Sequence, residues 1–145
     1  MQTRRVLPLV ILFSFGLMAQ VPAERIHAGF KALSTGSWAD AFKEWDKQAL
    51  PYAPVDPEPR AVLEDWIPKT WGIGSWELLQ TTSVSKLWQR QWWLVSFDQG
   101  VVFFSFDYVI HKGEWRIFRI QVSRDPATVL PGLDLYPNLA ARARE

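Results

Sequence analysis

The chain has 145 residues, enough for one domain, with 48% hydrophobic residues, nine tryptophans and a formal net charge of +1. This near balance of charge excludes a typical nucleic-acid-binding surface, which needs a large excess of Lys and Arg. Cysteine is absent and only two histidines occur, His27 and His111. The sequence therefore excludes disulfides and cysteine ligands, and we expect no metal site and no other cofactor.

Residues 1–23 have the three parts of a secretory signal peptide. Two arginines precede an apolar run of thirteen residues over 6–18, and small side chains lead up to Ala23. The apolar run is shorter than a comfortable membrane-spanning helix. We predict cleavage after Ala23, with Ala19 as the alternative, and a periplasmic or secreted protein with no membrane attachment after cleavage. An uncleaved anchor is the alternative interpretation. An exported domain without cysteine is typical of a bacterial periplasm.

Three helices are predicted in the first half of the mature chain. Apolar residues at helical spacing mark residues 24–33 and 38–50. Between them, Ser37 followed three residues later by Asp40 has the pattern of a capping box, which starts the second helix. After a proline-rich loop, a third helix is expected to begin at Pro57, because proline is favoured in the first turn.

From residue 75 the hydrophobic period changes to two, which predicts four β-strands. These strands are residues 75–85, 88–97, 101–110 and 114–123. Short turns at 98–100 and at Gly113 make the last three strands an antiparallel meander. The prediction is therefore an α+β domain over residues 24–128, with N-terminal helices packed on an antiparallel sheet, followed by a C-terminal tail over 129–145.

The two faces of the predicted sheet differ in composition. In the third strand, every second residue from Val102 to Ile110 is apolar, so this side is expected to pack on the helices. The fourth strand is expected to add Phe118, Ile120 and Val122 to it. The opposite face mixes rings with polar groups: Phe103, Ser105, Asp107, Trp115, Ile117, Arg119 and Gln121. Trp92 and Trp93 are adjacent, so one enters the core and the other joins the mixed face, and a bulge would exchange them.

A mixed aromatic face of this kind has three common roles. It can bind a second copy or another protein, where Trp and Arg are favoured. It can line a pocket for an apolar small molecule, or the chain's own loops can cover it. We predict a homodimer or a protein partner, with an apolar small molecule as the alternative. The predicted contact residues are Trp92, Trp93, Phe103, Asp107, Trp115 and Arg119.

Asp107 and His27 are the two candidates for catalysis. A carboxylate among aromatic rings would have a raised pKa and could act as a general base. The alternative, which the sequence favours, is a cross-strand ion pair of Asp107 with Arg119 or Arg116. His27 lies in the first helix, where it could border the interior of the fold. The sequence favours a binding domain over an enzyme.

Two segments carry a resemblance to a known superfamily: "FKALSTGSWADAFKEW" at 30–45 and "FDYVIHKGEWRIFRIQVSRDP" at 106–126. The N-terminal segment is similar to paired opening helices around a small-residue turn, and the C-terminal segment is similar to a closing hairpin. Over about residues 24–128 the chain resembles the nuclear-transport-factor-like, or cystatin-like, α+β cone, in which N-terminal helices pack on a curved antiparallel sheet. This resemblance implies either a binding or dimerising domain, like small exported bacterial members of unassigned function, or an isomerase- or cyclase-type enzyme with a Trp-lined cavity.

Overall fold

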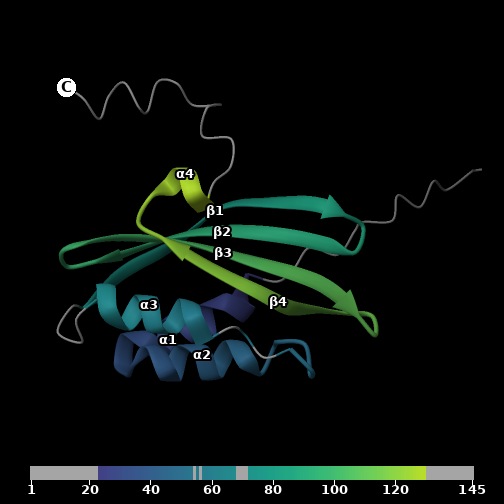
Figure 1. Cartoon of the computed structure of the whole chain (residues 1–145), viewed down its shortest axis with the longest axis horizontal. Coiled ribbons are helices and arrows are strands. Elements are labelled where there is room, and N and C mark those ends of the chain that lie inside the picture. The colour runs from purple at the N-terminus through teal and green to yellow at the C-terminus, as the bar shows by residue number, and fades with distance from the viewer. Residues whose placement is uncertain (1–22, 54, 56, 68–71, 130–145) are drawn as a thin grey trace, which may run out of the picture.

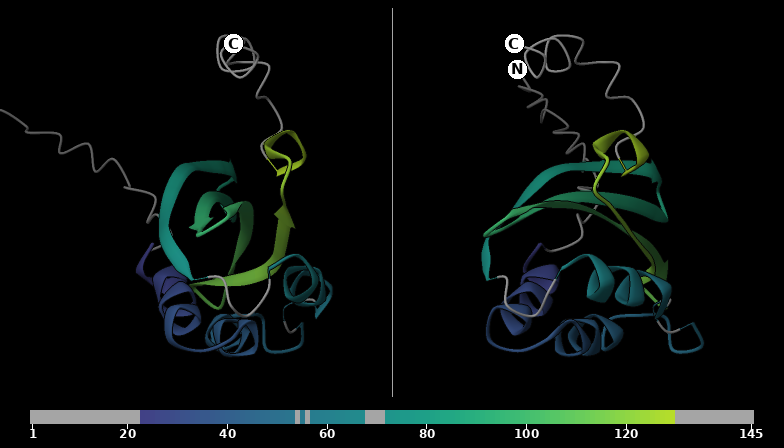
Figure 2. Two further views of the ribbon diagram at one scale, coloured as in Figure 1. Left: turned by 90° about the vertical axis from the view of Figure 1, so that its left-hand side faces the viewer. Right: turned by 60° about the vertical axis from the view of Figure 1, so that its left-hand side comes forward.

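The computed structural model describes residues 23–53, 55, 57–67 and 72–129. The elements in chain order are α1 (Glu24–Thr35), α2 (Trp38–Asp46), α3 (Pro57–Trp66), β1 (Ile73–Ser85), β2 (Trp88–Phe97), β3 (Gly100–His111), β4 (Glu114–Ser123) and α4 (Pro126–Val129). Helices α1 to α3 lie on one side of a strongly curved sheet, and α4 lies on the other (Figures 1 and 2). The predicted α+β fold is confirmed. The predicted signal peptide and C-terminal tail lie outside the described residues, apart from Ala23 and Val129.

The boundary between α1 and α2 follows the predicted capping box. The backbone N–H of Ser37 donates to Asp40 Oδ2 at 2.9 Å, and the backbone N–H of Asp40 donates to Ser37 Oγ at 3.4 Å. The Ser37 hydroxyl also donates to Asp40 Oδ2, at 2.8 Å. These bonds satisfy backbone donors that have no partner within the first turn of the helix.

Replacing Ser37 by alanine is expected to lower the thermal midpoint by a few degrees and to change the titration of Asp40. Hydrogen bonds from Ser37 lower the pKa of Asp40 below its usual 3.8. The stabilisation from a lowered carboxyl pKa is present above the unfolded value and is lost as pH falls through the folded value. NMR titration is expected to show the pKa of Asp40 rising towards 3.8 in Ser37→Ala. Ser34→Ala, a change at an exposed serine that does not cap, is expected to leave that pKa unchanged.

All neighbouring strands pair antiparallel, in the order β1-β2-β3-β4. The turn between β3 and β4 has positive φ at both central residues, 50° at Lys112 and 81° at Gly113. A type I′ hairpin turn needs this conformation, and Gly113 adopts it without strain. The outer edge of β4 is partly paired by the chain after α2, because Leu50 N–H donates to the Ile117 carbonyl at 3.0 Å and Ile117 N–H donates to the Gln48 carbonyl at 2.9 Å.

Aromatic rings fill the space between the helices and the sheet. At the centre, Trp45 lies 5.3 Å from Phe30 and 5.2 Å from Phe106 between ring centroids, and its indole N–H donates to the Ile26 carbonyl at 3.2 Å. Edge-on contacts of this kind add to the free energy gained by burying large rings. The apolar stripe predicted for α2 is confirmed, and most of the tryptophans of the described chain are used for packing.

Gln91 is a buried polar residue beside these rings. Gln91 Oε1 accepts hydrogen bonds from Trp93 Nε1 at 3.3 Å and from the Tyr108 hydroxyl at 3.4 Å. Burial raises the pKa of Tyr108 well above 10, and the charge of Arg25 opposes this rise. Tyr108 is fully buried and belongs to the core cluster, which confirms its predicted core position.

The face assignment predicted for β4 is wrong at three residues because of a β-bulge. Asp107 of β3 pairs with Arg119 of β4, but the next residue, Tyr108, pairs with Ile117. Phe118 is therefore the extra residue of the bulge. Trp115 and Ile117 consequently belong to the core cluster rather than to the mixed face. Phe118 lies on the mixed face instead, with its ring centroid 5.8 Å from that of Trp88.

Candidate binding face of the sheet

We call the sheet surface turned away from α1, α2 and α3 the outer face. Pairing and alternation place every second side chain of the central strands on it. Its main residues are Trp88, Arg90, Trp92, Phe103, Ser105, Asp107, Phe118, Arg119 and Gln121. This face corresponds to the predicted mixed face, with Phe118 gained and Trp115 and Ile117 lost to the core.

The pair Trp92 and Trp93 divides between the two faces. Trp93 is in the core cluster with Phe104, whereas Trp92 pairs with Ser105 on the outer face and is only 7% exposed. The guanidinium of Arg90 lies 5.9 Å from the Trp92 ring and 6.0 Å from the Trp88 ring. The alternating Trp88, Arg90 and Trp92 therefore form one cation–aromatic row rather than a platform of open rings.

Asp107 is fully buried and is held by two arginines, and we call these three residues the Asp107 clamp. Arg90 Nε donates to Oδ1 at 2.5 Å, and Arg90 Nη2 donates to Oδ2 at 2.8 Å. From β4, Arg119 Nε donates to Oδ2 at 2.7 Å, and Arg119 Nη2 lies 2.6 Å from the same atom. Trp88 Nε1 adds a longer hydrogen bond to Oδ1, at 3.4 Å.

The predicted ion pair between Asp107 and Arg119 is therefore present, and Arg90 is a second partner. The alternative partner, Arg116, binds Glu114 instead, at 2.5 Å. The hydrogen bond to Asp107 raises the pKa of Arg90 above its usual value. A carboxylate has about four acceptor sites, and in the clamp they are taken up by guanidinium and indole N–H groups. This arrangement favours a structural role for Asp107 over that of a general base.

The clamp leaves the centre of the outer face with one surplus positive charge. Its two cations differ in exposure: the Arg90 side chain is 17% exposed and the Arg119 side chain is 43% exposed. Arg119 also lies 5.8 Å from the half-buried Phe118 ring, which in turn lies 5.8 Å from the half-buried Trp88 ring. The outer face thus presents one accessible guanidinium among aromatic groups.

His27 is separated from the clamp by the sheet. It is an exposed residue of α1, and its ring lies 5.2 Å from that of Trp93 and 6.3 Å from that of Trp76, both in T-shaped contacts. Trp93 belongs to the core face, so His27 and Asp107 lie on opposite sides of the sheet. The structure does not bring the two candidate catalytic residues to one site.

Three residues of this face were not predicted: Trp88, Arg90 and Phe118, the last because of the bulge in β4. Strand alternation places Trp88 and Arg90 on the same face as Trp92, which was a usable signal. Among the described residues, no three side chains of His, Asp or Glu gather as they would around a metal ion. None of the helices in that part of the chain has the length and apolar character needed to cross a membrane.

Comparison with known proteins identifies similar folds but no sequence relatives. No model of a protein family matches the chain, and no curated protein matches it. Among solved structures, a DUF4783 family protein from Bacteroides ovatus is similar with a TM-score of 0.52 and 10% identity, covering 72% of this chain and 96% of that one. A DUF4783 family protein from Bacteroides uniformis has a TM-score of 0.50 and 11% identity, covering 73% and 98%. At such low identity, these similarities show a shared fold alone.

Proposed function

We propose that this chain is an exported, non-catalytic member of the nuclear-transport-factor-like, or cystatin-like, cone superfamily, and that it forms a homodimer through its outer face. Helices followed by a curved antiparallel sheet support the superfamily assignment. The signal-peptide pattern of residues 1–23 supports export to the periplasm or the medium. The single observation that carries the dimerisation proposal is the partly exposed Arg119 among half-buried aromatic rings.

The residue types of this face suit a protein interface. Arg, Trp and Phe are enriched where proteins meet, because they bury much area and Arg can stack on rings. In a pair of outer faces, the guanidinium of Arg119 in one copy can contact the ring of Phe103 or Phe118 in the other. Such contacts would accommodate the surplus charge of each clamp without a carboxylate from the partner.

Native mass spectrometry of the protein purified from the exported fraction tests this proposal. The expected result is a dimer whose subunit mass corresponds to cleavage after Ala23. Phe103→Arg, which adds a charge to the outer face without touching the clamp, is expected to give a monomer. Tyr52→Arg is the matched control, because Tyr52 is exposed beside His111 and is not one of the outer-face residues; this variant is expected to remain a dimer.

Two outcomes would contradict the dimer. A bare monomer at micromolar concentration would exclude a stable interface. A monomer carrying a small molecule would indicate the alternative function, a binding module or enzyme for an apolar ligand. In that case, the mass of the adduct would identify the class of ligand, and turnover could be tested directly.

A further inference from the structure

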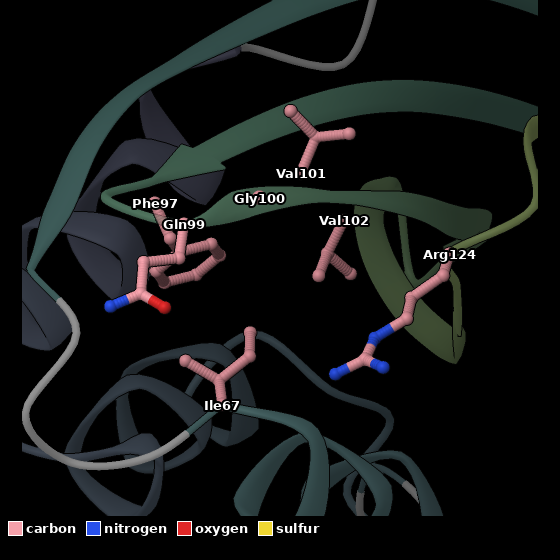
Figure 3. Close-up of a pocket in the computed structure, with 7 residues that line it drawn as sticks. All are labelled: Ile67, Phe97, Gln99, Gly100, Val101, Val102 and Arg124. Carbon is pink, nitrogen blue, oxygen red and sulfur yellow. The ribbon is translucent and has the colours of Figure 1, made fainter.

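A small cavity lies away from the Asp107 clamp, where α3 ends next to the turn between β2 and β3 (Figure 3). Its volume is about 230 Å³. The floor consists of three buried apolar side chains, Ile67, Phe97 and Val102. Gln99 and Arg124 are the polar side chains of the rim. In Figure 3 the guanidinium of Arg124 points between Ile67 and Val102, into the cavity.

Arg124 is bound to α3 through one of its donors, and no other residue that the structure describes accepts from it. Its Nη2 donates to the Trp66 carbonyl at 2.6 Å, and the guanidinium carbon lies 5.1 Å from the centroid of the Trp66 ring. A guanidinium has five N–H donors, and this bond uses one of them. Arg124 is an exposed residue, and the Trp66 contacts restrict its side chain, which lowers the conformational entropy that is lost when a ligand binds.

No carboxylate among the described residues forms an ion pair with Arg124. Two acidic residues are close in sequence to the residues of the cavity: Asp125 follows Arg124, and Asp98 lies in the turn between β2 and β3. Both bind backbone groups instead. Asp98 accepts from Gly72 N–H at 2.9 Å, and Asp125 accepts from Ala127 N–H at 2.9 Å. The cavity therefore combines an apolar floor with one positive charge that its described neighbours do not balance.

We propose that this cavity binds a small monocarboxylate with a short apolar tail. A guanidinium matches a carboxylate with parallel hydrogen bonds, and the apolar floor suits an alkyl chain. A monoanion is favoured over a dianionic phosphate because Arg124 is the one charged side chain among the described residues that line the cavity. The volume is below the roughly 300–1,000 Å³ of drug-sized sites. At about 30 Å³ per water-sized group, it holds roughly eight such groups, the size of hexanoate.

Titration with sodium hexanoate, followed by the methyl NMR signals of Ile67 and Val102, tests the proposal. The expected result is saturable shifts at these methyl groups, with much smaller shifts elsewhere. Hexan-1-ol, which has the same tail without the charge, is expected to bind at least about tenfold more weakly. Inorganic phosphate is expected to leave these methyl signals unchanged.

Two variants assign the binding to Arg124. Arg124→Gln is expected to weaken hexanoate binding by about tenfold or more and to leave hexan-1-ol binding unchanged. If this variant fails to fold without the contact to Trp66, Arg124→Lys keeps a charge but loses the planar fork, and it is expected to give a smaller loss. Phe103→Arg on the outer face is expected to bind hexanoate as the unmodified protein does, which separates this site from the proposed dimer interface.

Three results would overturn the assignment. Equal binding of hexan-1-ol and hexanoate would show that the charge plays no part. Tighter binding of phosphate would exclude the monocarboxylate class. Absence of shifts at Ile67 and Val102 with millimolar hexanoate would show that the cavity does not take the ligand.

Discussion

Asp107→Asn is expected to lower the free energy of unfolding by about 3–5 kcal/mol, the range for removing one partner from a buried ion pair. The change removes the negative charge between Arg90 and Arg119, which both lie within 2.8 Å of the carboxylate. The two cations would then face an amide that can accept at only one of its atoms. Urea denaturation measures the loss, with Asp65→Asn, a change at an exposed residue of α3, as the control expected to have little effect.

The two arginines of the clamp provide a matched comparison. Arg90→Met is expected to lower the free energy of unfolding more than Arg119→Met does. The Arg90 side chain is the less exposed of the two, so water screens its ion pair with Asp107 less. An Asp107→Asn variant as stable as the unmodified protein would show that the clamp does not hold the sheet together. Asp107 would then again be a candidate for a catalytic base, and an activity assay with small carbonyl compounds would test this role.

The sequence predicted the secondary structure well where two independent signals agreed. The spans 88–97 and 114–123 match β2 and β4, because apolar alternation and short turns both bound them. The start of α2 at Trp38 followed from Ser37 and Asp40, whose side chains bond only to local backbone and to each other. Signals of this kind act within a few residues, so they can be recognised without knowing the tertiary structure.

The contact between Arg90 and Asp107, one half of the clamp, could also have been predicted from the sequence. The turn between β2 and β3 has two residues, so Phe97 pairs with Gly100, and counting back along both strands places Arg90 opposite Asp107. The turn was predicted over 98–100, one residue longer than it is, so the pairing register of β2 with β3 was not determined. Alternation alone placed Asp107 on the outer face, but only the register identifies its partner across the strands.

Arg119 reaches Asp107 only because of the bulge at Phe118. Without it, the pairing of His111 with Glu114 would continue, and Phe118 would face Asp107 while Arg119 would face Phe106 on the core side. The bulge prevents the burial of Arg119 and lets Ile120 enter the core. In the structure, Ile117 and Ile120 both belong to the core although they are three positions apart, which a regular strand does not allow. Strict alternation misplaced Trp115 for the same reason.

Gly29→Ala is expected to destabilise the protein by about 1–3 kcal/mol or more, the range for overpacking a core. Helix propensity alone predicts the opposite, a gain of up to about 1 kcal/mol for alanine over glycine. The steric effect is expected to dominate because a Cβ on Gly29 would lie 2.1 Å from Nε1 of Trp45. That ring cannot easily move away, since it is fully buried and packed 5.0 Å from Phe42.

Urea denaturation of two pairs of variants separates the steric effect from propensity. Ala28→Gly, at the exposed neighbouring position of α1, is expected to lower stability by about 1 kcal/mol through propensity alone. In a Trp45→Leu background, Gly29→Ala is expected to lower the free energy of unfolding much less, because the atoms that the new methyl group would meet are gone. A stabilised Gly29→Ala protein would show instead that α1 can move away from Trp45. The close approach of α1 to α2 would then not be what requires glycine at this position.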